Sequence, residues 1–235
     1  EGQKTVAFEM MNQLKWQAPD HVVVPGGNMG NSSALGKGFE ELLALGLIDA
    51  LPKLSVIQAE GASPLARLFA SLPPSKPSTE PSLPESILME DHPSTLATAI
   101  KIGAPVSWKK ALRAVLRSGG KIISVSEQEI ADAKAMIGRD GIGCEPASAT
   151  TVAGIKRLIA AGHIRPEESV VAVLTGHVLK DPDYVSAYHR GTLELDSAGS
   201  GHGAESLRIH GAFPNAPQHV EASKSAILKL LGQQR

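Results

Sequence analysis

The sequence is poor in aromatic residues and carries no excess of either charge, and both shortages exclude classes of protein. Phe, Trp and Tyr make up 3% of the 235 residues while 42% are hydrophobic, so any core must be mainly aliphatic. Lys and Arg number 23 against 24 Asp and Glu. With no basic excess to bind phosphates and few rings to stack on bases, we expect no nucleic-acid partner.

Cysteine, long apolar runs and metal-ligand spacings are also scarce. The single cysteine, Cys144, excludes an intrachain disulfide and a multi-cysteine zinc site, and it favours a reducing compartment. No apolar run approaches the roughly 20 residues of a membrane span, and we expect no signal peptide. We therefore expect a cytoplasmic protein with no membrane partner. The histidines show no metal-ligand spacing, so we expect no metal site.

Short apolar runs alternate with helical patterns along most of the chain. Strands are predicted at 21–25, 54–60, 121–126 and 169–176. Helices are predicted over 1–14, 31–46, 63–72, 93–103, 107–120, from residue 126 onward, 145–162 and 221–232. This rhythm is typical of an α/β protein whose largely parallel sheet is flanked by helices.

Two segments interrupt this alternation. Residues 71–86 contain five prolines, which predicts a proline-rich surface loop. The Gly-His-Gly motif around His202 also predicts a loop, and Asp-Pro-Asp at 181–183 is typical of a turn.

A glycine-rich stretch, PGGNMGN at residues 25–31, follows the apolar run VVV and precedes a predicted helix. Glycine allows close approach to a ligand, and a helix N-terminus presents free N–H groups and a positive dipole end. The expected ligand is a phosphate, with a simple packing turn as the alternative. The glycine spacing and the late Glu60 do not fit a dinucleotide fingerprint, and GKG at 36–38 lacks the hydroxyl residue of a Walker loop.

A second candidate, LTGHVLKDPD, places Thr175 at the carboxyl end of the last predicted strand. Open α/β sheets bind their ligands at such ends. The hydroxyl can donate to, or accept from, a nitrogen of a bound heterocycle. A structural turn threonine is the alternative.

Six blocks occur in an order that resembles the threonine synthase family over nearly the whole chain. They are EGQKT…FE, VVVPGGNMGN…KGF, GLID.LPKL…QAEGASPL, TLATAIKIGAPVSWKKAL, EPASA…AG and LTGHVLKDPD. The ending, FPNAPQHVEASKSAILKLLG, is similar to that of the plant-like branch. The family belongs to the fold-type II pyridoxal-phosphate enzymes, with a tryptophan synthase beta-like architecture.

The resemblance implies a cofactor and its ligands. It implies that residues 1–235 form the cofactor-binding large domain and C-terminal tail, and that the cofactor is pyridoxal 5′-phosphate. The residues expected to bind the phosphate are Gly27, Asn28, Met29, Gly30 and Asn31. Thr175 is expected to hydrogen-bond the pyridine nitrogen. A neutral hydroxyl stabilises a pyridinium less than a carboxylate does, so the ring is expected to be a moderate electron sink.

The activity that the resemblance implies is conversion of O-phospho-L-homoserine and water to L-threonine and phosphate, by an enzyme that can be a homodimer. The Schiff-base lysine lies upstream of EGQKT in the family, in a Phe-Lys-Asp-Arg type motif that this sequence lacks. We therefore expect a fragment that is inactive alone, and we do not transfer that role to Lys180. Val178 departs from the family's usual glycine.

Three alternatives remain open at this point. Another fold-type II enzyme, such as a threonine or serine dehydratase, would share the phosphate-binding loop. A truncated, non-catalytic paralogue that binds a ligand would account for the missing lysine. A dinucleotide-dependent oxidoreductase fits least, because of the glycine spacing.

Overall fold

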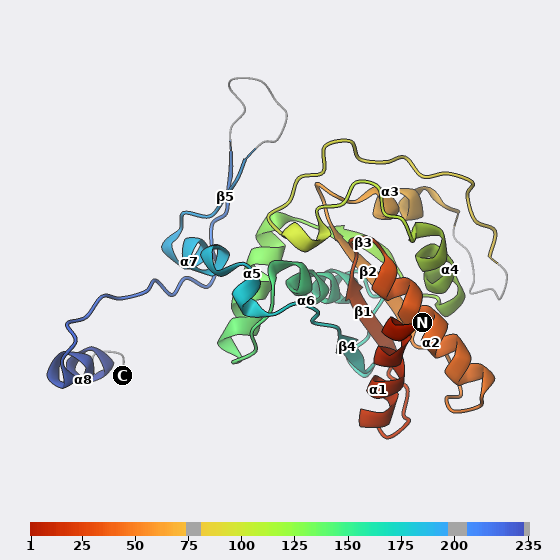
Figure 1. Ribbon diagram of the computed structural model, residues 1–235, viewed down its shortest axis with the longest axis horizontal. Coiled ribbons are helices and arrows are strands. Elements are labelled where there is room, and N and C mark those ends of the chain that lie inside the picture. The colour runs from red at the N-terminus through yellow and green to blue at the C-terminus, as the bar shows by residue number, and fades with distance from the viewer. Residues whose placement is uncertain (74–80, 197–205, 233–235) are drawn as a thin grey trace.

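The computed structural model describes residues 1–73, 81–196 and 206–232, and its centre is a four-stranded sheet (Figure 1). The strands are β1 (His21–Pro25), β2 (Lys53–Ala59), β3 (Ile122–Val125) and β4 (Val170–Ala172). They lie in the order β3-β2-β1-β4, and every neighbouring pair is parallel. The predicted α/β class with a parallel sheet is confirmed.

Helices cover both faces of the sheet. One face is covered by α1 (Thr5–Gln13), α2 (Gly30–Ala44), α3 (Pro64–Ser71) and α4 (Trp108–Ser118), and the other by α5 (Glu127–Arg139) and α6 (Pro146–Ala160). The strand residues alternate between these layers. Val22 and Val24 pack in the first core and Val23 in the second, because successive strand side chains point to opposite faces.

The strand order creates a topological switch beside β1. The chain runs from β1 outward to β2 and β3 on one side, and then returns through α5 and α6 to place β4 on the other side of β1. The connections therefore diverge at the carboxyl ends of β1 and β4. Open α/β sheets hold their ligands in the crevice at such a point.

The remaining elements surround this body. Short 3-10 turns form η1 (Gly2–Lys4), η2 (Thr98–Ile100) and η3 (Val178–Lys180). Helix α7 (Pro182–Arg190) and the hairpin of β5 (Glu194–Leu195) and β6 (Leu207–Arg208) form a small core against α5. Helix α8 (Lys224–Gly232) lies apart from the body (Figure 1).

Some predicted elements differ from the structure. The helix predicted over 93–103 is wrong, because only η2 is helical there. Backbone groups of this stretch bond to other segments instead: Ser94 donates to the Gly61 carbonyl at 2.8 Å, and the Gly103 carbonyl accepts from Glu90 at 3.0 Å. The last strand of the sheet is shorter than the predicted 169–176.

Helix α7 and the β5–β6 hairpin were not predicted. Pro182, read as part of a turn, instead occupies the first turn of α7, where proline costs no hydrogen bond. Residues 74–80 of the proline-rich segment and the His202 motif lie outside the described residues. Within the described ranges, every helix is too short or too polar to cross a bilayer.

Candidate functional site

The loop of residues 27–31 presents free backbone donors at the carboxyl end of β1. Gly26 still bonds to β2, donating to the Ile57 carbonyl at 2.7 Å. In the described part of the chain, the N–H groups of residues 27–32 donate no hydrogen bond, and Ser33 is the first to do so, to the Met29 carbonyl at 3.1 Å. Helix α2 begins here without a side-chain cap. Free donors and a positive dipole end therefore coincide.

Contacts from other segments brace this loop. Met29 has a left-handed φ of 65° although it is not glycine, and its side chain is buried in the core. A Cβ on Gly27 would lie 3.0 Å from the Ala99 carbonyl, so only glycine fits there without displacement. The Asn28 Oδ1 accepts from the Val106 N–H at 2.8 Å. Strained conformations persist where the surroundings hold them, so the loop is preorganised.

The asparagine amides add side-chain donors to the loop. Gln3 of η1 donates through Nε2 to Asn31 Oδ1 at 3.0 Å, as Val106 does to Asn28. Both oxygens thus accept hydrogen bonds from the protein, and within the described ranges neither amide nitrogen donates one, so both nitrogens are available to a ligand. Sequence reasoning missed Gln3, whose place beside the loop depends on how η1 packs against α2.

Thr175 lies three residues beyond β4, inside a network with Ser148 of α6. The N–H groups of Thr175 and Gly176 donate to Ser148 Oγ at 2.8 and 3.2 Å. These bonds use both acceptor positions of Ser148, so its hydrogen points to Thr175 Oγ1 at 3.1 Å. Thr175 Oγ1 in turn donates to Glu145 Oε1 at 3.1 Å. Toward a ligand this hydroxyl can therefore only accept, a restriction that the sequence did not reveal.

Glu145 is a buried carboxylate at the start of α6, and sequence reasoning missed it. Its N–H donates to the Gly176 carbonyl at 2.9 Å, and a Cβ on Gly176 would overlap its carboxyl group. Its Oε2 lies 2.6 Å from Lys180 Nζ, and this ion pair raises the pKa of Lys180. An acidic residue followed by proline at a helix start was the available signal, but the pattern equally suits a structural helix start.

These two clusters line one cavity of about 500 Å³ at the carboxyl ends of β1 and β4. All six predicted binding residues line it: Gly27, Asn28, Met29, Gly30, Asn31 and Thr175. Gln3, Glu145 and Lys180 line it as well, and the first turns of α2 and α6 both reach it. Its volume suits a cofactor-sized molecule. No cluster of His, Cys, Asp and Glu within the described ranges forms a metal site.

Val178 does not disturb the backbone beyond Thr175. It begins η3, and the preceding His177 caps this turn by accepting through Nδ1 from the Leu179 N–H at 3.2 Å. Among the described non-glycine residues, positive φ angles occur at Lys15, Trp16 and Met29. Valine therefore replaces the usual glycine without backbone strain at this point.

Comparison with known proteins places the chain in a family. Residues 1–176 match the family described as pyridoxal-phosphate dependent enzyme. The chain belongs to this family. It is 47% identical over 184 residues to threonine synthase of Methanocaldococcus jannaschii, covering 78% of this chain and 43% of that protein. It is 46% identical over 186 residues to threonine synthase of Methanosarcina acetivorans, covering 79% of this chain and 43% of that protein.

Solved structures agree on the fold of this family member. Threonine synthase from Escherichia coli superposes with a TM-score of 0.54 at 20% identity, covering 99% of this chain and 48% of that one. The cofactor of the matched family is pyridoxal phosphate. The chain spans less than half the length of the curated relatives that it matches.

Proposed function

We propose that this chain is the cofactor-binding part of a threonine synthase. It would hold pyridoxal phosphate between the 27–31 loop and Thr175, within a protein that converts O-phospho-L-homoserine and water to threonine and phosphate. The observation that carries the proposal is the convergence of unbonded N–H groups and the Thr175 hydroxyl on one cavity. The 46–47% identity to threonine synthases supports the choice of reaction.

The loop suits a phosphate in both charge and geometry. Backbone N–H groups and the amide nitrogens of Asn28 and Asn31 are donors without partners in the described part of the chain. Donors of this kind at a helix N-terminus bind phosphate without needing a cationic side chain. The amino-terminal half-turn of α2 thus provides the site for the cofactor's phosphate.

Thr175 suits the other end of the cofactor, the pyridine nitrogen. Because its hydrogen is donated to Glu145, the hydroxyl presents a lone pair. A ring nitrogen that bonds to it must therefore carry a hydrogen. This differs from the sequence-based expectation of a moderate electron sink, because the buried Glu145 carboxylate, one hydroxyl away, favours the protonated ring. With ¹⁵N-labelled cofactor, we expect the ring resonance at its protonated position; an unprotonated shift would contradict this reading.

When bound, pyridoxal phosphate stabilises negative charge at substrate carbons next to its attachment point. Residues 1–235 contribute the phosphate contacts, the orientation of the ring and the partner of its nitrogen. We propose that the lysine which bonds the cofactor lies outside this sequence. Lys180 lines the cavity, but its ion pair with Glu145 holds the amine protonated, and a protonated amine is a poor nucleophile.

The further properties of the parent protein belong to the same proposal. We propose that it is cytoplasmic, that its partner is a small phosphorylated amino acid, and that it can form a homodimer. Residues 1–235 would form its large domain and C-terminal tail.

The test uses the full-length protein loaded with pyridoxal phosphate. Given O-phospho-L-homoserine, it should release threonine and inorganic phosphate in equal amounts, measured by amino-acid analysis and a phosphate assay. The matched reactions contain L-threonine or L-serine instead. Formation of 2-oxo acids from these, without threonine from the phosphorylated substrate, would identify a dehydratase. No turnover of any of them, with cofactor still bound, would favour the non-catalytic alternative.

A further inference from the structure

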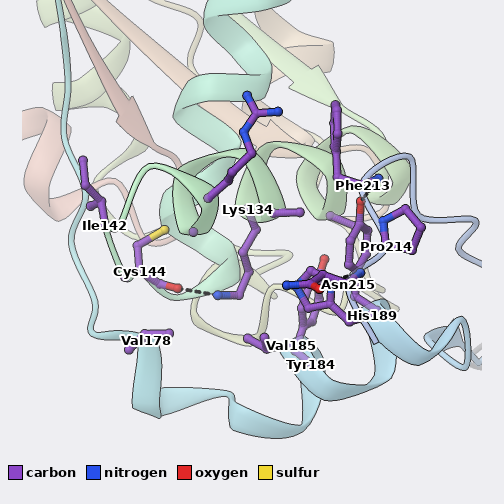
Figure 2. Close-up of a pocket in the computed structure, with 16 residues that line it drawn as sticks. Lys134, Ile142, Cys144, Val178, Tyr184, Val185, His189, Phe213, Pro214 and Asn215 are labelled. Atoms are coloured by element: carbon purple, nitrogen blue, oxygen red, sulfur yellow. Dashed lines mark hydrogen bonds between the residues drawn. The ribbon is translucent and has the colours of Figure 1, made fainter. Parts of the chain in front are cut away.

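A second cavity, of about 450 Å³, lies between α5 and α7 (Figure 2). Helix α5 forms one wall and α7 the opposite wall, while the 142–144 turn, Val178 and residues 213–215 complete the lining. It shares no lining residue with the cavity at the 27–31 loop. Its volume lies within the range of small-molecule sites.

A buried lysine is the main polar feature of this cavity. Lys134 of α5 is only 7% exposed, and its Nζ donates to the Cys144 carbonyl at 2.7 Å, the dashed line in Figure 2. Within the described ranges, no carboxylate lies within ion-pair distance of it. Burial lowers the pKa of Lys134, and the charge of Asp181 acts in the opposite direction. Since Lys134 donates one hydrogen bond within the described ranges, to Cys144, two of the three N–H donors of its ammonium group remain for a ligand.

The other polar side chains of the lining favour an anion. Arg139 and His189 are the other basic residues there, and among the residues that the structure describes neither Asp nor Glu lines the cavity. His189 Nδ1 accepts from the Asn215 N–H at 3.0 Å, so Nε2 is left as a donor. The Arg139 guanidinium lies 5.7 Å from the centre of the Phe213 ring. An anionic ligand would meet positive charge at both the buried and the exposed parts of this site.

The walls specify the rest of the ligand. Ile142, Val178, Val185, Phe213 and Pro214 present apolar surface to the cavity. The last turn of α5, including Gly138 and Arg139, also lines it. A helix C-terminus carries partial negative charge and disfavours a dianion such as phosphate more than it disfavours a monoanion. One buried ammonium amid apolar walls instead suits a single carboxylate joined to an apolar body.

We propose that this cavity binds a small organic monocarboxylate, whose carboxylate accepts hydrogen bonds from Lys134 Nζ while its apolar part packs against the walls. The site involves none of the residues assigned to pyridoxal phosphate. It therefore does not depend on the proposed function.

Benzoate is a suitable probe, and benzyl alcohol is its neutral counterpart. Binding would be measured by titration calorimetry on the full-length protein, with saturating pyridoxal phosphate and inorganic phosphate to occupy the first cavity. Benzoate should bind at one site per chain, and benzyl alcohol should bind at least about tenfold more weakly, since it lacks the charged acceptor. Equal binding of the two, or no binding of benzoate, would overturn the proposal.

Two variants locate the site. Lys134→Met keeps the length of the side chain and removes its charge, and should weaken benzoate binding at least about tenfold. Lys156→Met, at an exposed position on α6, is the matched control and should leave binding unchanged. Val185→Phe keeps Lys134 but fills the cavity, and should also weaken binding. Far-ultraviolet circular dichroism checks that each variant is folded; undiminished binding in both folded cavity variants would refute the site.

Discussion

Replacing Thr175 by valine separates two roles that the structure gives to one hydroxyl. Thr175 Oγ1 donates to the buried Glu145 carboxylate and accepts from Ser148, at 3.1 Å in each case. Valine removes both of these hydrogen bonds, whether or not a cofactor is bound. Because Thr175 itself is exposed and water can reach the gap, we expect a loss at the lower end of the usual range, about 1–2 kcal/mol of unfolding free energy. A small stability effect alone therefore does not show that Thr175 touches a ligand.

The Thr175→Val substitution should also weaken the binding of the cofactor, in addition to lowering stability. If Thr175 accepts a hydrogen bond from the ring nitrogen, valine should weaken pyridoxal-phosphate binding and reduce turnover by about ten- to a hundredfold, since each factor of ten is about 1.4 kcal/mol. Thr175→Ser keeps the hydroxyl and should stay near wild type. The measurements are a cofactor titration by absorbance and urea unfolding of the cofactor-free, full-length protein.

Ser148→Ala is the matched control, because it disturbs the same network from the buried side and leaves the Thr175 hydroxyl in place. We expect it to lower stability about as much as valine does, with a smaller effect on cofactor binding. If both variants weaken cofactor binding equally, Thr175 acts only through the network and the ring-nitrogen assignment is wrong.

Three further predictions follow from other parts of the structure. Residues 1–235 alone, supplied with pyridoxal phosphate, should form no threonine and no borohydride-stable adduct on lysine; mass spectrometry showing such an adduct would place the reactive lysine within this chain. The pKa of Glu168 is lowered to about 2 from 4.5, first by a hydrogen bond from Lys53. The contribution of Glu168 to the free energy of unfolding is therefore present above about pH 4.5 and is lost as the pH falls toward 2. Glu168→Gln should flatten the fall in unfolding free energy over this interval, and an unchanged slope in urea titrations would contradict the assignment. Gly176→Ala should displace the Glu145 carboxyl and weaken cofactor binding, whereas an unchanged cofactor titration would show that the backbone can move aside.

Much of the fold was predictable because its signals are local. The apolar runs of β1, β2 and β3 and the glycine-rich turn after β1 require no knowledge of distant contacts. The Ser126–Glu129 capping box that begins α5 is equally local, and the structure contains both of its hydrogen bonds. The helix predicted over 93–103 was wrong for the opposite reason. Its apolar spacing is helical, but its backbone groups bond to Gly61 and other distant residues instead.

The six predicted binding residues were named from the sequence and the family resemblance, but the tertiary structure decided that they line one cavity. Only the pairing of β1 with β4 brings Thr175 to the loop of residues 27–31, across more than 140 positions of chain. The same arrangement adds Glu145 and Ser148, which fix the direction of the Thr175 hydrogen bond. Sequence alone determined which chemical groups this chain carries. Which of their hydrogens and lone pairs remain free for a ligand depends on partners distant in the chain, and only packing settles that.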